Sequence, residues 1–381
     1  MGRVAIVGLG VAILTVVFVS DGRASLHHPT DPMAVPVNAN GEPEALPFNE
    51  FLRRRLVLRN EFNEKWPLEF PDPKDPARKL KSDRGILKDR IDQERKVPNR
   101  TQEQSIALAV DLLRFGKADE ADGVLVGKQR QGYLGNITLA HIAAAQANPD
   151  QKLKSLNWPR ALDHLSIATD EVPPKEFPGL TPQQLAWQVK LNRTVLMKFM
   201  RLRLEEARGP KHPLEDELPD RIFDVNFVNA SGAYEPGVLA PGEAAKLPPD
   251  AIATAQQLAL WFPGDTRLYW LLAELYAAKG EFAAARKIMN ECVDSGTYSN
   301  RKALMQHREA VARAADAKGA APDEALIGPP ADQPAEPPPD VPFTMNAVWV
   351  YFGAVAALAL FALFRAVTKK RKGAADCGPI R

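Results

Sequence analysis

An uncharged stretch near the C-terminus constrains this chain most strongly. No charged residue occurs from Val341 through Phe364, and residues 347–364 are all apolar or Gly. A helix over residues 341–364 would be about 36 Å long, enough to cross a hydrocarbon core of about 30 Å. Trp349 and Tyr351 lie near one end, where aromatic rings favour the membrane interface. The pattern predicts a transmembrane helix over residues 343–367.

The N-terminus has the features of an export signal. Arg3 precedes an apolar run over residues 4–19, and Gly22 and Ala24 form a small-x-small pair. A short basic region, a short apolar run and such a pair are typical of a secretory signal peptide. We therefore expect residues 1–24 to be a signal peptide or, alternatively, an uncleaved signal anchor.

The basic residues predict how the chain crosses the membrane. Arg365 follows the apolar stretch directly, and the run 369–372 beyond it consists of Lys and Arg. Such residues concentrate on the cytoplasmic side of membrane proteins. We therefore expect a single-pass protein of the cytoplasmic (inner) membrane, with a basic cytoplasmic tail over 368–381 and an extracytoplasmic (periplasmic) body.

Prolines divide the remaining sequence into segments. The chain has 33 prolines in 381 residues, above the usual share of about 5%, and they gather in clusters. Residues 318–342 are predicted to be a Pro-rich linker. Residues 25–100 are expected to form a flexible, charged lead-in, disordered over 26–47, with a short helix over 48–65. The stretch 85–96 is expected to be either a charged helix or a solvated linker.

Residues 101–317 carry the pattern of a helical body. Apolar residues recur there at spacings of three and four, which is typical of amphipathic helices. Helices are predicted before Gly116 and over 118–125, 137–147, 159–168, 182–208 and 301–315. The least helical part is a Pro- and Gly-rich insertion over 209–250, in which the alternation of Phe223, Val225 and Phe227 predicts a short strand.

Residues 266–299 place small and large side chains at fixed positions on two helices separated by Gly280. The small positions hold Ala273, Ala285 and Cys292, and the large ones hold Tyr269, Leu272, Tyr276, Phe282 and Met289. This pattern resembles a tetratricopeptide repeat, although Thr297 replaces its final proline. Degenerate copies precede it. The resemblance implies an all-α, tetratricopeptide-like helical repeat or solenoid; the alternative is a helical bundle without repeats.

The sequence shows no recognisable catalytic or metal-binding motif. His141 and His164 lie on separate predicted helices and could meet, but no HExxH pattern or carboxylate partner accompanies them. Neither a GxSxG nor a phosphate-binding GxxxxGK[ST] sequence occurs. We therefore expect no catalytic residues, no cofactor, no metal and no enzymatic activity. The net charge of only +2 gives no reason to expect nucleic acid.

These features together favour a membrane-anchored protein–protein interaction scaffold. A tetratricopeptide-like stack offers a concave surface to a protein or peptide partner. The resemblance implies that Arg267, Trp270 and Glu274 line that surface, with Trp270 either an anchor for the partner or a core residue. The alternative is a ligand sensor or enzyme with its site in the loop 209–250.

Overall fold

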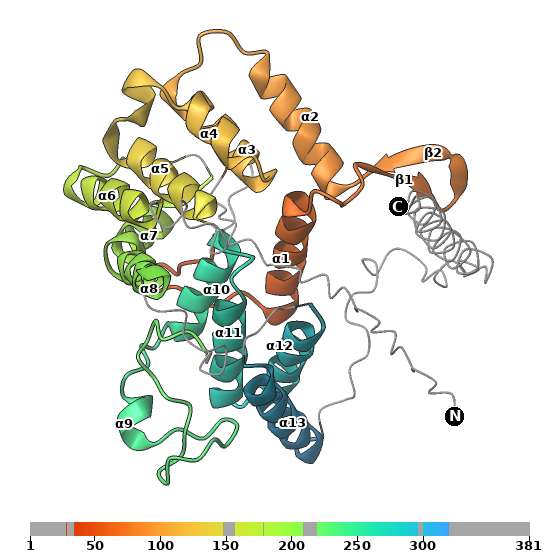
Figure 1. The fold of residues 1–381 in the computed structure, drawn as a ribbon, viewed down its shortest axis with the longest axis vertical. Coiled ribbons are helices and arrows are strands. Elements are labelled where there is room, and N and C mark those ends of the chain that lie inside the picture. Colours follow the sequence, from red (N-terminus) through yellow and green to blue (C-terminus); the bar gives the residue numbers. More distant parts are fainter. Residues whose placement is uncertain are drawn as a thin grey trace, which may run out of the picture. The chain divides into compact units, whose positions relative to one another are not determined.

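The computed structural model describes residue 28 and residues 34–147, 157–177, 179–208, 219–295 and 300–319. All of them belong to one compact unit, residues 1–324, and they are mostly helical (Figure 1). The predicted signal peptide, transmembrane helix and basic tail lie outside the described residues, as does nearly all of the predicted linker. Among the residues that are described, no helix is both long enough and apolar enough to cross a membrane.

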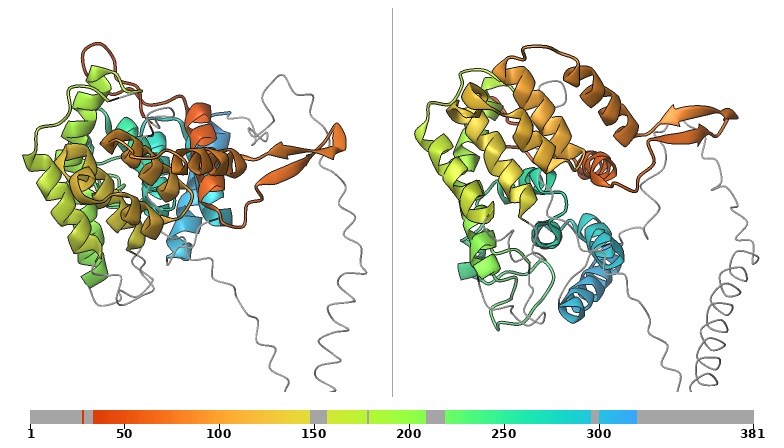
Figure 2. Two further views of the ribbon diagram at one scale, coloured as in Figure 1. Left: turned by 90° about the horizontal axis from the view of Figure 1, so that it is seen from above. Right: turned by 45° about the horizontal axis from the view of Figure 1, so that its top comes forward.

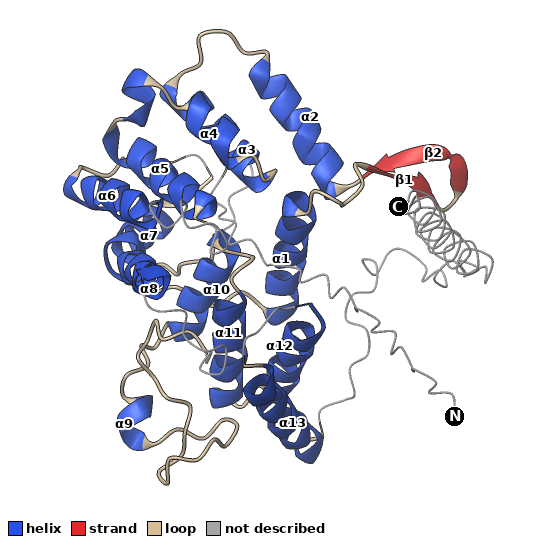
Figure 3. Cartoon of the chain, viewed as in Figure 1, coloured by secondary structure: helices blue, strands red, loops and turns tan. Residues whose placement is uncertain are grey.

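The N-terminal part begins with an extended segment, residues 34–47, which we call the strap. It is the red trace that leads into α1 (Phe48–Phe62) in Figures 1 and 2. A hairpin of β1 (Glu69–Asp72) and β2 (Asp75–Lys81) follows, and then α2 (Asp83–Arg95). The strands pair antiparallel, with Glu69 opposite Lys81, and β2 is exposed along its whole length (Figure 3). The hairpin was not expected, whereas the charged helix formed.

The helical body continues to the end of the described chain. Its elements are α3 (Gln102–Arg114), α4 (Ala118–Val124), a 3-10 turn (Gly127–Arg130), α5 (Gly132–Gln146), α6 (Asn157–Asp170), α7 (Pro182–Leu191), a π-helical turn (Asn192–Leu196), α8 (Met197–Arg208), α9 (Pro241–Ala244), α10 (Ala251–Trp261), α11 (Thr266–Ala278), α12 (Phe282–Ser295) and α13 (Arg301–Ala317). The helices predicted within residues 101–317 all form, and the long one contains the π turn.

Helices that follow one another in sequence pack against one another. The most extensive contacts join α5 to α6, α11 to α12 and α12 to α13, while α1 contacts α2, α3 and α10. Local sequence fixes where two of these helices begin, because Thr101 and Thr181 each cap a helix reciprocally with Gln104 and Gln184. At the turn between α11 and α12, Gly280 adopts φ +80°, a conformation that favours glycine.

The positions that carried the repeat pattern lie in the core. Ala273 and Ala285 are fully buried where α11 and α12 pack, and small residues allow such close packing. Cys292, the third small residue, is also buried, as are the larger residues of the pattern: Tyr269, Leu272, Tyr276, Phe282 and Met289. This packing agrees with the physical logic of the pattern, in which large side chains fill the groove between two helices.

The loop over 219–250 is irregular apart from α9. Val225 and Phe227 are buried and Phe223 is half-buried, but no strand forms there, so the strand prediction was wrong. Alternation gave the correct buried side, yet within the described ranges no neighbouring segment offers this stretch a ladder of main-chain hydrogen bonds. The loop instead packs on α11 at Gly237, where a Cβ atom would lie 2.6 Å from the Ala277 carbonyl oxygen.

This close approach makes Gly237 a test of how the loop is attached. Gly237 has φ +77°, so Gly237→Ala meets both a strained backbone and the α11 carbonyl. We expect it to lower the free energy of unfolding by about 2–5 kcal/mol, measured by urea denaturation. Gly232→Ala is the matched control, because Gly232 has φ +82° but open space around it. That variant should lose only about 1–2 kcal/mol; equal losses would show that the contact with α11 is unimportant.

Candidate functional site

The two ends of the strap are buried against the helical body and are held there by glutamine side chains. Val35 is 0% exposed. Its amide donates to Oε1 of Gln257 (3.0 Å), and Nε2 of Gln184 donates to its carbonyl (3.3 Å). Both main-chain polar groups of Val35 are therefore satisfied by side chains of α7 and α10, as buried main-chain groups require. Residues 34–47 thus depart from the expected disorder.

A second contact of the same kind holds the other end of the strap. The Leu46 amide donates to Oε1 of Gln256 (2.7 Å), and Nε2 of Gln256 donates to the Leu46 carbonyl (3.0 Å) and to the Tyr276 hydroxyl (2.8 Å). Burial raises the pKa of Tyr276 to about 12. We call Gln184, Gln256 and Gln257 the amide clamp, because the side-chain amide of each one binds main-chain atoms of the strap.

Between the two clamped residues the strap turns at the surface. The side-chain oxygen of Asn38 accepts from the amides of Asn40 and Glu42, both at 3.0 Å. Gly41 adopts φ +81° in this turn, and residues 39–42 are exposed. The strap therefore consists of two buried anchors joined by an exposed turn.

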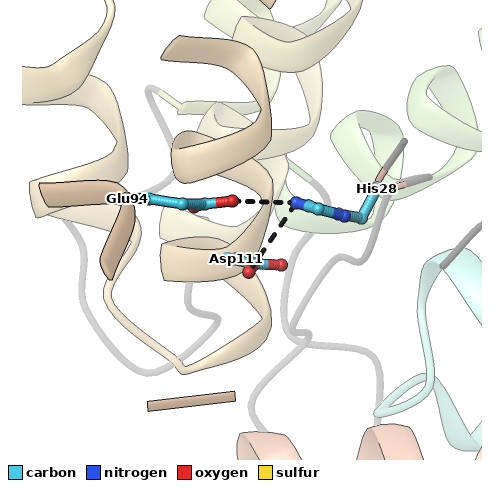
Figure 4. A group of neighbouring side chains, drawn as sticks. All are labelled: His28, Glu94 and Asp111. Carbon is cyan, nitrogen blue, oxygen red and sulfur yellow. Dashed lines mark hydrogen bonds and ion pairs between the residues drawn. The ribbon is translucent and has the colours of Figure 1, made fainter. Parts of the chain in front are cut away.

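A buried histidine contacts the body upstream of the strap. Nε2 of His28 lies 3.1 Å from Oε1 of Glu94 and 3.8 Å from Oδ2 of Asp111 (Figure 4). One atom from each of these side chains lies within 4.8 Å of the others, a spacing at which they could hold a divalent cation. However, Arg90 already pairs with Asp111 through two hydrogen bonds, one of 2.7 Å from a terminal guanidinium nitrogen. The cluster is therefore better explained as ion pairs that join residue 28 to α2 and α3.

The structure places two of the three expected partner-contact residues in the interior. Trp270 is 0% exposed and Glu274 is 1% exposed. Glu274 accepts hydrogen bonds from Nε1 of Trp270 (3.0 Å) and from the Tyr234 hydroxyl (3.0 Å), and Nδ1 of His307 lies 2.7 Å away. Of the two roles that the sequence allowed for Trp270, partner anchor or core residue, its burial favours the core. Glu274 is likewise not a surface contact.

Glu274 joins three elements through these bonds. Tyr234 comes from the loop 219–250, and His307, whose ring stacks on Tyr234, comes from α13. Burial and the nearby charge of Glu274 raise the pKa of Tyr234 far above its ordinary value, so its hydroxyl remains a donor. The arrangement satisfies a buried carboxylate and attaches the loop and α13 to α11, which is a structural role.

Arg267 is the member of the expected set that remains partly exposed, at 24% of its side chain. It forms a two-bond ion pair with Glu206 at 2.6 and 2.5 Å. Glu206 also contacts Arg203, which donates to Asp265 (2.9 Å) at the start of α11. Arg267 is therefore engaged within the chain.

His141 and His164, which the sequence suggested could meet, do not form a site with each other. His141 is fully buried, stacked on Phe262, whereas His164 lies 3.2 Å from the Asn136 side chain. Burial lowers the pKa of His164.

No protein-family model, curated protein or solved structure matches this chain. Inferences about its function therefore rest on the geometry of the clamp and its surroundings.

Trp270→Ala tests whether this side chain belongs to the core. Because Trp270 fills space inside the body, we expect the substitution to lower the free energy of unfolding by about 3–5 kcal/mol. Arg267→Ala, on the same helix, should cost no more than about 1 kcal/mol, because its ion pair is partly solvated. Equal, small losses in chemical denaturation would show that Trp270 is not a core residue.

Gln256→Leu tests the amide clamp. The substitution keeps the approximate size of the side chain but leaves the Leu46 amide and carbonyl without their partner. We expect a loss of about 2–5 kcal/mol in stability, since each buried unpaired group costs about 1–3 kcal/mol. Hydrogen exchange of the Leu46 amide should accelerate. Gln102→Leu, the same change at an exposed glutamine, is the control; a similar result at both positions would argue against the clamp.

Proposed function

We propose that this protein is an interaction scaffold whose helical interior binds extended peptide segments, held at the outer face of a cytoplasmic membrane by its C-terminal segment. The observation that carries this proposal is the strap itself. It is an extended segment whose two buried ends are bound to a helical body, through their main chain, by side chains of helices far away in sequence.

The chemistry of the clamp suits peptide recognition in general. Main-chain hydrogen bonds give affinity for any extended peptide, and pockets for side chains give selectivity. Here the glutamine amides supply donors and acceptors, while the burial of Val35 and Leu46 supplies the apolar contacts. A partner segment with an apolar residue in the place of Val35 would satisfy the same groups and compete with the strap.

Two features of the sequence support the rest of the proposal. The small and large positions of α11 and α12 resemble a tetratricopeptide repeat, and stacks of such repeats bind peptides and proteins. The uncharged stretch 341–364, followed by the basic run 369–372, favours a single membrane span with a cytoplasmic tail. The body would then face outward and present its interior to envelope or secreted partners.

The alternative, a ligand sensor or enzyme with its site in the loop 209–250, receives less support. The polar side chains of the loop that contact the body attach the loop to it: Asp220 pairs with Arg203, and Tyr234 is bound by Glu274 and His307. The contacts between this loop and the body therefore support a structural role for the loop, and they favour the scaffold over a catalytic or ligand-sensing site in it.

An exchange experiment tests whether the interior binds peptide reversibly. A recognition sequence for a specific protease is inserted between Asn40 and Gly41, in the exposed turn, and the folded full-length protein is cut there. We expect the N-terminal fragment to stay bound through gel filtration and then to exchange with excess labelled peptide of residues 28–40. Replacing both Gln184 and Gln257 with Leu should speed its release about tenfold or more, because buried hydrogen bonds are lost.

A matched peptide with Val35→Asp is the control, because a charge in this buried position is costly. Binding of this peptide equal to that of the unaltered one would contradict specific recognition. Immediate loss of the cut fragment, with no uptake of labelled peptide, would show that only the covalent connection keeps the strap in place. A fragment that never exchanges would show a closed core instead of a binding site.

A further inference from the structure

Both residues that the amide clamp binds are followed directly by proline. Val35 precedes Pro36, and Leu46 precedes Pro47. Both clamped residues are buried, whereas Pro36 is half-buried and Pro47 is exposed. An aliphatic residue followed by proline is therefore the element that the two ends of the strap have in common.

The clamp binds a residue whose backbone is extended. In an extended residue the N–H and C=O groups point to the same side, whereas in a helix they point in opposite directions along the axis. The single side-chain amide of Gln256 reaches both groups of Leu46, its Oε1 accepting at 2.7 Å and its Nε2 donating at 3.0 Å. Gln257 and Gln184 divide the same two contacts at Val35. Each end of the clamp therefore recognises one extended residue through its main chain.

A proline after the clamped residue holds that residue in the extended conformation. The proline ring clashes with a helical backbone at the preceding residue and so restricts it to extended conformations. A segment that is already restricted in this way loses less conformational freedom when it binds. The restriction acts in the free segment, so it increases affinity without any contact to the ring itself.

The prolines leave no main-chain group of their own without a partner. A proline has no amide hydrogen to satisfy. The Pro36 carbonyl accepts from the Glu44 amide (2.9 Å), and the Pro47 carbonyl accepts from the Phe51 amide (3.0 Å). Each proline therefore fits its end of the strap without leaving a hydrogen bond unmade.

The residue before Val35 extends the motif on its N-terminal side. Ala34 is 5% exposed, and its carbonyl accepts from Nη1 of Arg54 on α1 (2.9 Å). Glu50 holds Arg54 in place, because its Oε1 accepts from Nε of Arg54 at 2.7 Å. A large side chain in the place of Ala34 would have to displace packed neighbours, which is destabilising. A small residue therefore suits this position.

We propose that the partners of this protein carry a small residue, an aliphatic residue and a proline in succession, within an extended segment that takes the place of residues 34–36. This inference rests on the proposed function, and it narrows the partners from extended peptides in general to one class. Gln257 and Gln184 bind the aliphatic residue, and Arg54 binds the carbonyl before it. The proline keeps the segment extended while the partner is free.

Peptide exchange on the cut full-length protein tests the role of the proline. The protein that carries a protease site between Asn40 and Gly41 is cut, and labelled peptides of residues 28–40 replace the cut fragment, followed by fluorescence anisotropy. Pro36→Ala in the peptide should weaken binding about two- to fivefold, because the free peptide is then less extended. N-Methylalanine in place of Pro36 restricts the preceding residue in the same way, so this peptide should bind about as tightly as the unaltered one.

The order of the residues tests the class of partner. A short peptide with Ala-Val-Pro between Gly and Ser residues should bind saturably. The same composition in the order Ala-Pro-Val should bind about tenfold more weakly, because a proline in the clamped place offers no N–H to Gln257.

The outcomes separate this inference from the proposed function. If the unaltered peptide binds but Pro36→Ala or the reversed order binds equally well, the proline has no role and the proposed scaffold stands without it. If no peptide binds, the proposed function fails and this inference fails with it. N-Methylalanine that binds as weakly as alanine would contradict the conformational account, since it would show that the ring itself is bound.

A measurement on the uncut chain does not depend on exchange. Pro36→Ala should speed hydrogen exchange of the Val35 amide about two- to fivefold, because this end of the strap then opens more often. Pro98→Ala is the matched control, since Val97 and Pro98 form the same dipeptide at an exposed place, and it should leave the Val35 amide unchanged. No acceleration in Pro36→Ala, or an equal one in both variants, would overturn the inference.

Discussion

The structure depends on how an extended segment satisfies its main-chain hydrogen bonds inside a body made of helices. A helix satisfies its own amides and carbonyls, but an extended strand normally needs a neighbouring strand. The strap has no such neighbour at Val35 or Leu46, and the amide clamp takes that place. Because one primary amide carries both a donor and an acceptor, Gln256 alone satisfies both main-chain groups of Leu46. The anchored strap then covers faces of α7 and α10 that would otherwise be open.

A second buried polar group organises the elements packed around α11. Glu274 lies on α11, a helix whose residues 268–277 are all buried, so its carboxylate needs internal donors. The loop 219–250 and α13 supply them through Tyr234 and His307. A loop rich in Gly and Pro is thereby attached to the core by a specific bond, and Gly237 permits the close contact beside it. The insertion consequently behaves as a covering of α11 and not as an independent domain.

Periodicity was sufficient to predict the helices, because their apolar faces and caps are local signals, as at Thr101 and Thr181. It could not predict the strap, since its partners lie 210 and 222 residues away and a Pro-containing segment with few apolar residues resembles a disordered one. The burial of Trp270 and Glu274 was hard to predict for a related reason. A helical pattern indicates which residues share a face, but residues 268–277 of α11 are buried on every side, and Arg267 alone of the expected set stays partly exposed. The adjacent glutamines 256 and 257, buried in an otherwise apolar helix, were the available signal.

The clamp is built on two helices that are packed closely elsewhere. Gln184 on α7 and Gln257 on α10 both bind Val35, and Gln188 and Trp261, one turn further along each helix, are buried in the interior. A packed interior has little freedom to adjust one turn without moving the next. Under the proposed function, a peptide that takes the place of the strap would therefore have to fit the spacing of α7 and α10 that Val35 occupies now.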